Sequence, residues 1–475
     1  MMKNERREST GSLSTVNGVK VLRLYGGPYE IGKQHGTQMA KEIATLVPEA
    51  LDAAAAVIAK TIKVSYQTAK QLMELGRDAA RPYIPDRFMA EMQGITVGVN
   101  EAGYFINLED VLLWNSMYDL WCLYAHPQYS HPSDSLAQKG EFSGGEPGSH
   151  VLVVAGCSSF SAWGKAVVGD ALIHGKNMDN LNLPGILDSR ILVIVQPDSG
   201  CDHAFITHPG MIGIDGGMNS AGISMMTQYD AFIDETMKGC GIGVHTRLLL
   251  TDAGTLDEAV GSLADHPHCT GIAFHVADSN RNSAVIVNAS AKQFTLRYPT
   301  REMLFTSNHT NCYPGWYGYD GYNMVKDQQK VYTLTDVSTI EVWQTSLRDP
   351  KNIWVPAPSR FERYEQLLGE QIGRITPQSA QQILSDRYDP YTGKTRDKWS
   401  PSVSNNILAT ICALYPDDTF YEDDPAKTFK AHVANLWSMV MTPKTGDFWL
   451  AIQDFPAQYG GYVHFNLASL IAEKE

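Results

Sequence analysis

The sequence lacks the features that mark several common classes of protein. Its seven cysteines are odd in number and show no C-x-x-C spacing, so they form no disulfide framework, and we expect a reducing compartment. Lys and Arg total 38 against 52 Asp and Glu, and no basic cluster offers a face for nucleic acid. No apolar run approaches the roughly 18 residues of a membrane span, so we expect a soluble chain.

Familiar catalytic motifs are also missing. Neither G-x-S-x-G nor H-E-x-x-H occurs, which removes the common serine-hydrolase and zinc-protease signatures. The segment Gly27–Lys33 fits half of a phosphate-binding loop. Gln34 replaces the hydroxyl residue that would meet magnesium, and Pro28 removes a backbone N–H from the cradle. This segment is therefore read as a strand-to-helix turn.

Two further absences bear on cofactors and location. The cluster His266–Cys269 matches no standard zinc-ligand spacing, so we expect no metal and no other cofactor. No apolar segment follows the polar residues 1–13, and we therefore expect a cytoplasmic protein without a signal peptide.

The 475 residues are 43% hydrophobic and 10% aromatic, enough for a large core. Apolar spacing predicts helices first and strands later, an order that favours an α+β fold over a doubly wound one. Loop composition separates the two blocks at residues 126–149. The predicted helices are Tyr29–Lys60, Tyr66–Ala80, Pro85–Asn100, Leu108–Tyr124, Gly243–Leu263, Arg360–Glu370 and Thr376–Asp386. The predicted strands are Val19–Tyr25, Val151–Val154, Ala166–His174, Ile191–Gln196, Ala204–Thr207, Gly222–Gln228, Gly271–Val276, Ser283–Asn288, Leu408–Ala413, Leu436–Thr442 and Asp447–Gln453.

Cys157 stands out as a candidate nucleophile. It follows Gly156 at the end of the apolar run Val151–Ala155, and the next predicted strand leads to Gly175–Asp179. An N-terminal cysteine carries its own base, because its α-amino group has a pKa of about 8. Cutting the Gly156–Cys157 bond would create that amine, through attack of the thiol on the Gly156 carbonyl and hydrolysis of the resulting thioester. Taken alone, Cys157 would be read as a small buried core residue, as most free cysteines are.

An ordered set of segments resembles the N-terminal-nucleophile (Ntn) hydrolases. More narrowly, it resembles the acyl-coenzyme A:6-aminopenicillanic acid acyltransferase (isopenicillin N acyltransferase) family, related to the choloylglycine hydrolase/penicillin V acylase family. The resemblance implies a four-layer αββα sandwich with a mostly helical N-terminal segment. The matching segments are Gly27–Gly36, Glu91–Gly98, Leu108–Leu113, Gly156–Phe160, Gly175–Asp179, Met218–Gly222, Arg247–Leu250, Thr255–Ala259, Asn308–Thr310 and Ser359–Leu368.

The resemblance also implies residue roles. Cys157 matches the nucleophile and the self-cleavage residue, and Asp179 matches a carboxylate that orients the new α-amine. Asn308 matches a side-chain amide of the oxyanion hole. Arg360 matches an arginine beside the nucleophile, and Arg363, one helical turn further on, is an alternative for that role. Each of these residues also has a purely structural reading, as a turn cap, a strand end or a solvated helix face.

Two departures from the family pattern leave the substrate open. Lys176 stands where bile salt hydrolases carry Arg, and Asn180 stands where many relatives carry an aromatic residue. Both border the expected acyl pocket, so we take them as substrate-binding positions.

The resulting hypothesis is a self-activating cysteine amidohydrolase or acyltransferase. It is made as a zymogen and acts on a small acyl-amide through a Cys157 thioester, and an amine or acyl-coenzyme A is left open as the co-substrate. Residues 1–18 are expected to be a polar tail, residues 19–156 a mostly helical part and residues 157–475 the catalytic part. Two alternatives remain: a lipid amidase or phospholipase-like esterase on the same fold, and a non-catalytic binding protein. Assembly into a homo-oligomer is also open.

Overall fold

The computed structural model describes most of the chain, with gaps. The described residues are 10–62, 64–125, 155–169, 171–181, 183–230, 235–292, 294–299, 301–308, 331–332, 357–390, 393–395, 410–412, 418–420, 429–431 and 433–473. The predicted strand Val151–Val154 and the loop at 126–149 lie outside them.

The described strands form two large sheets. In the ten-stranded sheet the pairs β2–β5 and β11–β13 are parallel and the other pairs antiparallel. Its order is β1 (Ser12–Val16), β2 (Val19–Gly26), β5 (Ile191–Pro197), β6 (His203–Thr207), β7 (Gly216–Asn219), β8 (Ile223–Tyr229), β9 (Ile272–Asp278), β10 (Ser283–Ala289), β11 (Phe294–Arg297), β13 (Val331–Tyr332).

The six-stranded sheet is antiparallel throughout. Its order is β12 (Met303–Ser307), β3 (Ala155–Ala162), β4 (Ile173–Leu181), β18 (Val433–Thr442), β19 (Asp447–Ala451), β20 (Val463–Asn466). Two short pairs lie apart: β14 (Tyr388–Asp389) with β15 (Lys394–Thr395), and β16 (Asp418–Phe420) with β17 (Phe429–Ala431).

Helices cover the outer faces of both sheets. On the ten-stranded sheet, α6 (Ile242–Asp252) contacts β7 and β8, and α7 (Leu256–Asp265) contacts β9 and β10. On the six-stranded sheet, α9 (Ala357–Glu370) contacts β12, and α10 (Pro377–Leu384) contacts β4 and β18. The sheets themselves meet where β3 contacts β8. This order of layers confirms the α+β fold, a four-layer αββα sandwich.

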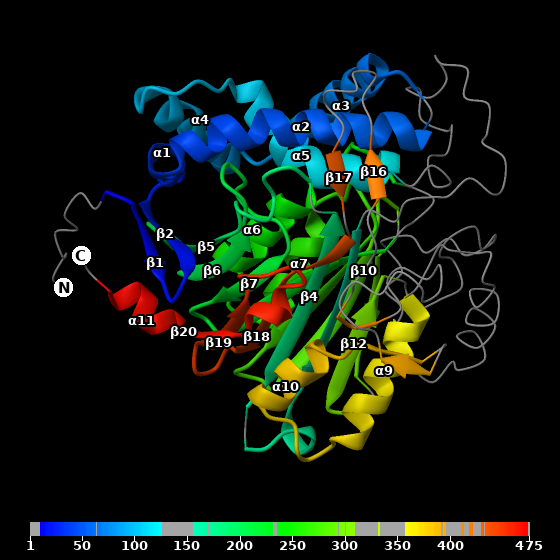
Figure 1. Cartoon of the computed structure of the whole chain (residues 1–475). Coiled ribbons are helices and arrows are strands. Elements are labelled where there is room, and N and C mark those ends of the chain that lie inside the picture. Colours follow the sequence, from blue (N-terminus) through cyan, green and yellow to red (C-terminus); the bar gives the residue numbers. More distant parts are fainter. Residues whose placement is uncertain are drawn as a thin grey trace, which may run out of the picture.

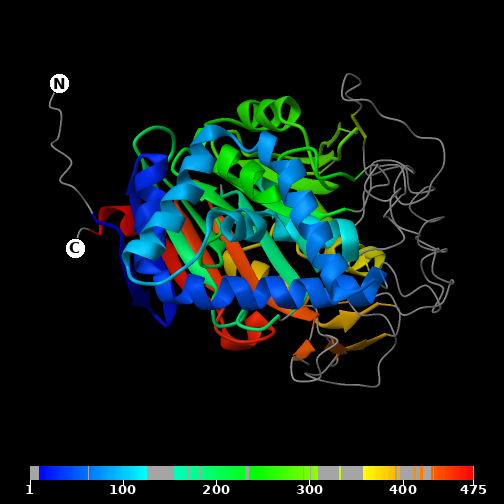
Figure 2. The ribbon, with the colours of Figure 1, turned by 90° about the horizontal axis from the view of Figure 1, so that it is seen from above.

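The N-terminal helices gather at one end of the sandwich. They lie together at the top of Figure 1, with α9 and α10 at the bottom, and they cross in front of the strands in Figure 2. These helices are α1 (Pro28–Gln38), α2 (Ala40–Ile62), α3 (Tyr66–Ala80), α4 (Asp86–Glu101) and α5 (Leu108–Ala125). A short helix, α11 (Leu467–Ala472), follows β20. No described helix has both the length and the apolar character needed to cross a bilayer.

Most predicted helices are confirmed, but the breaks within them were missed. The predicted helix Tyr29–Lys60 is divided at Met39 into α1 and α2, and Gly243–Leu263 is divided before Leu256 into α6 and α7. Residues 12–16, inside the segment expected to be a polar tail, form β1. Asn17 and Gly18 adopt positive φ angles of 49° and 82°, which turns the chain back onto β2.

Two predicted strands are wrong in place. The strand expected at Ala166–His174 begins only at Ile173, because residues 164–166 form a short 3-10 helix. Of the strand expected at Leu408–Ala413, only residues 410–412 are described, and these belong to no strand.

The glycines of the segment that resembled a phosphate loop serve helix packing. Gly32 and Gly36 of α1 face Gly94 and Gly98 of α4. A Cβ added at Gly32 would lie 1.9 Å from the Glu91 carbonyl oxygen. The backbones of the two helices can therefore approach closely only because side chains are absent at these positions.

Gly36→Ala is expected to lower the free energy of unfolding by about 1–3 kcal/mol. Its Cβ would lie 2.1 Å from the Ile95 carbonyl oxygen, so α1 must move away from α4. Gly261→Ala in α7 is the matched control, because nothing lies within 4 Å of its added Cβ. At this half-buried helix position the change to Ala should stabilise the protein by about 0.5–1 kcal/mol. Urea unfolding of both variants measures the difference, and equal effects would contradict the packing role.

Candidate active site

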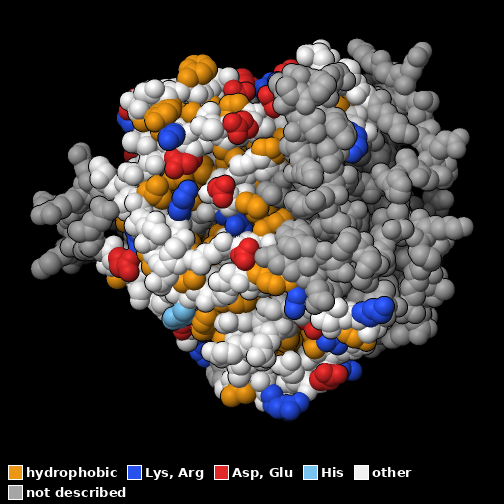
Figure 3. All heavy atoms as spheres, in the orientation of Figure 1, with side chains coloured by type: hydrophobic (Ala, Val, Ile, Leu, Met, Phe, Trp, Pro, Cys, Tyr) orange, Lys and Arg blue, Asp and Glu red, His pale blue; other side chains and the backbone are white. Residues whose placement is uncertain are grey.

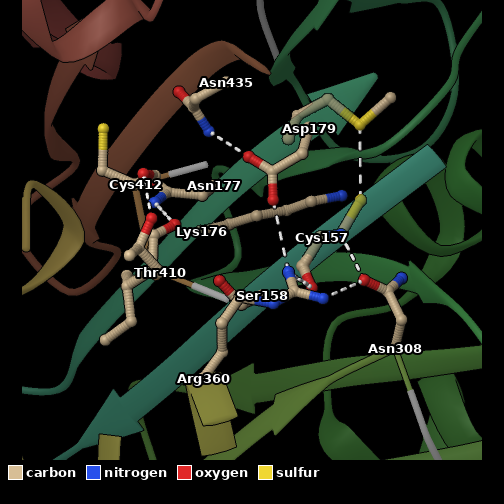
Figure 4. A network of polar contacts seen from close by, with 12 residues as sticks. Cys157, Ser158, Lys176, Asn177, Asp179, Asn308, Arg360, Thr410, Cys412 and Asn435 are labelled. Atoms are coloured by element: carbon tan, nitrogen blue, oxygen red, sulfur yellow. Dashed lines mark hydrogen bonds and ion pairs between the residues drawn. The ribbon is translucent and has the colours of Figure 1, made fainter. Parts of the chain in front are cut away.

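The backbone of Cys157 is held by two side chains that lie far away in the sequence. Its N–H donates to Asn308 Oδ1 at 2.7 Å, and its carbonyl oxygen accepts from Arg360 Nη1 at 2.8 Å. Asn308 directly follows β12, and Arg360 lies in the first turn of α9. Figure 4 shows Arg360 reaching between Asn308 and Asp179. Four segments of the chain thus meet at this one residue.

Asp179 completes the network from β4. Its Oδ2 lies 3.2 Å from Arg360 Nη1, and its Oδ1 accepts from Asn435 Nδ2 at 3.0 Å. Arg360 Nη2 also donates to Asn308 Oδ1 at 2.6 Å. Burial raises the pKa of Asp179 to about 6, although the Arg360 charge opposes that rise. Asp179 is therefore an ion-paired carboxylate at neutral pH. In the register of β3 with β4 it lies opposite Gly156.

The amide of Asn308 has a fixed orientation in this state. Its Nδ2 donates to the Tyr229 carbonyl oxygen at 2.8 Å, which turns Oδ1 toward the Cys157 nitrogen. The oxyanion-hole role expected from the sequence needs a donor, whereas the observed atom accepts. In the structure Asn308 Oδ1 holds the backbone nitrogen of Cys157.

The thiol of Cys157 lies on the face of β3 opposite to the Arg360 side chain. Its Sγ lies 3.4 Å from Met178 Sδ, and the residue is fully buried. Burial raises the pKa of the thiol to about 12, while the charge of Lys176 opposes that rise and Asp215 adds to it. The thiol is therefore protonated near neutral pH.

Lys176 and Asn180, expected to bind substrate, lie on the same face of β4. Lys176 is fully buried, with Nζ 3.2 Å from Asp215 Oδ1 and a further bond to the Thr227 carbonyl oxygen. Its ammonium also lies 5.2 Å from the centre of the Trp437 ring. Asn180 is half-buried near the end of β4. Lys176 thus acts on the thiol as a fixed positive charge.

Of the two candidate arginines, the structure brings Arg360 to Cys157. Arg363 instead pairs with Asp386 through Nε at 2.8 Å and Nη2 at 2.9 Å. Its guanidinium also lies 4.6 Å from the centre of the Tyr388 ring. Three residues along a helix leave the two side chains about 60° apart around the axis and about 4.5 Å apart along it, so Arg363 reaches a different partner.

The positions of Cys157 and Asp179 within their strands correct the sequence prediction. Both were expected just after strands, but Cys157 is the third residue of β3 and Asp179 lies within β4. The strands continue through polar residues because the space between the sheets is itself polar. Ser159 and Ser161 contact His275 Nδ1 and Nε2 at 2.8 and 2.7 Å.

Three residues near the site were missed. Asn435 on β18 bonds to Asp179, and Tyr364 on α9 shares a 2.9 Å hydrogen bond with Ser158 Oγ. Tyr118 on α5 lies near the thiol, and Cys157 contributes to raising the pKa of its hydroxyl. Tyr364 lies inside the matching segment Ser359–Leu368 but was given no role, whereas Asn435 and Tyr118 belong to no recognisable motif, and periodicity alone marks Tyr118 as a core residue.

Asp119 fixes α5 over this end of the sandwich. Its carboxylate accepts from Ile242 N, at the start of α6, at 3.1 Å and from Thr270 Oγ1 at 2.9 Å. Burial raises the pKa of Asp119 to about 7. Folding therefore favours the protonated form of Asp119. The contribution of this group to the free energy of unfolding is fully present below pH 4 and is lost as the pH rises through 7.

Asp119→Asn is expected to remove that pH dependence. Relative to the variant, the wild type should lose up to about 1.4 kcal/mol of unfolding free energy per pH unit between pH 4 and 7. Denaturant unfolding at several pH values measures the difference. The control is Asp257→Asn, which changes a carboxylate with 80% of its side chain exposed. Its curve of unfolding free energy against pH should run parallel to that of the wild type. Parallel curves for Asp119→Asn would contradict the prediction.

The chemistry of the site is that of a thiol with charged and amide neighbours. In the described part of the chain, no three His, Cys, Asp or Glu side chains are grouped to hold a metal ion. His266 Nδ1 and His268 Nε2 each lie 2.8 Å from a carbonyl oxygen of α7. On the face in Figure 3, basic, acidic and apolar side chains of the described residues are interspersed.

Comparison with known proteins gives one family and several distant relatives. The model of the family described as acyl-coenzyme A:6-aminopenicillanic acid acyl-transferase matches residues 168–422, more than half of the chain. An uncharacterized protein of Archaeoglobus fulgidus is 23% identical over 460 residues, which cover 92% of this chain and 70% of that protein.

Two solved structures are similar at low identity. The N-acylethanolamine-hydrolyzing acid amidase ortholog of Caenorhabditis elegans is 15% identical with a TM-score of 0.34, covering 60% of this chain and 93% of that one. A mutant conjugated bile acid hydrolase from Clostridium perfringens is 11% identical with a TM-score of 0.36, covering 66% and 93%. Similarity this low leaves the fold to rest on the sheet order and layers described above.

Proposed function

The chain belongs to the acyl-coenzyme A:6-aminopenicillanic acid acyl-transferase family, and from this premise we propose that it is a self-activating cysteine amidohydrolase or acyltransferase. The observation that carries the proposal is the convergence of Asn308, Arg360 and Asp179 on the Gly156–Cys157 segment. A buried core cysteine has no need of an amide, a guanidinium and a carboxylate at its backbone.

Self-cleavage is the first proposed step. The Cys157 thiol attacks the Gly156 carbonyl carbon, the peptide C–N bond breaks, and the proton passes to the Cys157 nitrogen. Water then hydrolyses the thioester, which leaves a Gly156 carboxylate and a free Cys157 amine. Asn308 Oδ1 already accepts from this nitrogen, and Arg360 polarises the Cys157 carbonyl. Both contacts persist without movement after the cut.

Acyl transfer is the second proposed step. The new α-amine removes the thiol proton, and the thiolate attacks the carbonyl carbon of a small acyl-amide. The substrate's amine departs with a proton, and the acyl group remains on Cys157 as a thioester. Water or an acceptor amine then resolves it. Lys176 favours the thiolate, since its charge lowers the pKa of Cys157.

Trapping the thioester tests this function. Cleaved protein is mixed with N-acyl amides, acid-quenched and weighed by mass spectrometry, with matched esters in parallel. A mass increase equal to the acyl group on the fragment that begins at Cys157 supports the proposal. Turnover of esters alone would favour the esterase, and absence of any adduct or turnover would favour a binding protein. Hydroxylamine, added to the running reaction, separates transfer from hydrolysis by capturing the acyl group.

A further inference from the structure

Several buried polar side chains on the elements around Cys157 lack hydrogen-bond partners. Among the described residues, Tyr118 Oη, Asp215 Oδ2, Asp230 Oδ1 and both side-chain polar atoms of Gln228 are buried without a hydrogen-bond partner. Their residues are between 0% and 5% exposed. Most buried polar groups in proteins are hydrogen-bonded, because an unpaired one is costly. Such a group of orphaned atoms in one region therefore indicates a missing partner.

Gln228 and Asp230 enter this region from strand β8. The carbonyl oxygens on either side of Gln228 are bound by site residues: Thr227 accepts from Lys176 and Tyr229 from Asn308. Ser224 Oγ lies 2.8 Å from His174 Nδ1 of β4, so its side chain faces the six-stranded sheet. Alternation along the strand gives Gln228 the same face. Asp230 directly follows β8 and is held through Oδ2 by Asn288 Nδ2 at 2.5 Å.

Tyr118 and Asp215 approach the thiol from other elements. Burial raises the pKa of the Tyr118 hydroxyl, and Cys157 and Asp215 add to that rise. The charge of Asp215 also raises the pKa of the Cys157 thiol, beside burial. Lys176 Nζ lies 3.2 Å from Asp215 Oδ1, and Oδ2 remains unpaired. Tyr118 also belongs to the same apolar cluster as Cys157 and Met178. The surroundings of the thiol thus combine apolar side chains with polar atoms that have no partner.

We propose that these side chains form a polar substrate subsite, which takes an uncharged hydroxyl or amide group of the acyl part beside the scissile carbonyl. An amide, a phenol and carboxyl oxygens can together donate to and accept from such a group. A plain alkyl chain would leave the same atoms unpaired in a site without water, which disfavours it by about tenfold or more. The ammonium of Lys176 is already engaged by Asp215, so a carboxylate has less to gain here.

This inference rests on the proposed function, and a pair of matched substrates separates the two. We would compare kcat/KM for the anilides of 2-hydroxyhexanoic and hexanoic acid. The wild type is expected to prefer the hydroxy substrate by at least tenfold. Gln228→Met and Tyr118→Phe should each bring that ratio several-fold closer to one. Gln382→Met and Tyr104→Phe, at exposed positions, are the controls and should keep the wild-type ratio.

Thermal unfolding of the ligand-free variants provides a second readout. Gln228→Met removes two unpaired buried atoms, so its Tm should equal or exceed that of the wild type. A lower Tm with an unchanged substrate ratio would show a structural role and overturn the subsite. Equal turnover of both anilides by the wild type would also overturn it, since the atoms would then hold only water. If neither anilide is cleaved and no thioester forms, the proposed function itself fails.

Discussion

Cys157→Ala is expected to stay a single 52.4 kDa chain, while the wild type separates into residues 1–156 and 157–475. The thiol is the only group that the proposed mechanism gives for attack on Gly156, so its removal should stop cleavage completely. Intact mass spectrometry of both purified proteins under denaturing conditions measures the outcome. N-terminal sequencing should find Cys157 at the start of the larger fragment.

The pKa of the thiol explains why this cleavage should be slow rather than immediate. Burial raises it to about 12, so only about one molecule in 10⁵ carries a thiolate at pH 7. The cleavage rate should therefore rise about tenfold for each pH unit between 6 and 9. A time course of the wild-type fragments in this range measures it.

Matched variants keep this prediction specific. Cys201→Ser changes a half-buried cysteine in the loop between β5 and β6 and should cleave like the wild type. Cys157→Ser retains a weaker nucleophile and should cleave more slowly than the wild type. If wild type and Cys157→Ala both remain whole at every pH, self-cleavage is wrong, and Cys157 becomes a core cysteine.

Several helices could be predicted from the sequence because they have one buried face and one exposed face. In α3, for example, Ala69, Leu72, Met73, Gly76 and Ala80 are buried at helical spacing. Strands β3 and β4 gave no comparable signal. They lie between a sheet and helices, and the polar Ser159, Ser161 and His174 form their inner face, so polar residues occur where an apolar run is expected.

The sequence could predict only those site residues that lie in recognisable motifs. Cys157 and Asp179 lie in adjacent strands that follow each other in the chain, so their proximity follows from local sequence. Asn435 and Tyr118 come from distant elements with ordinary composition, and only the assembled sheets and α5 place them here. The choice between Arg360 and Arg363 also needed the structure, because both lie on the same helix.

Those two arginines allow the sharpest test of the site. Arg360→Lys is expected to lower kcat/KM for an acyl-amide by at least about a hundredfold, because a single ammonium cannot replace three directed hydrogen bonds. Arg363→Lys should lower it by less than about threefold. That residue contacts Asp386 at a partly exposed position, where a salt bridge stabilises by at most about 1 kcal/mol.

A folding defect could imitate this loss, so the test needs a readout that misfolding would not change. Arg360→Gln removes a charge that lowers the pKa of Asp179, so this pKa should rise above about 6. Because catalysis needs Asp179 ionised beside the α-amine, the acid limb of the pH–rate profile should move to higher pH. Arg363→Gln should leave that limb in place. If the two glutamine variants show the same profile, Arg360 is a structural residue and the assigned site is wrong. A shift confined to Arg360→Gln would tie the carboxylate and the guanidinium to the reaction itself.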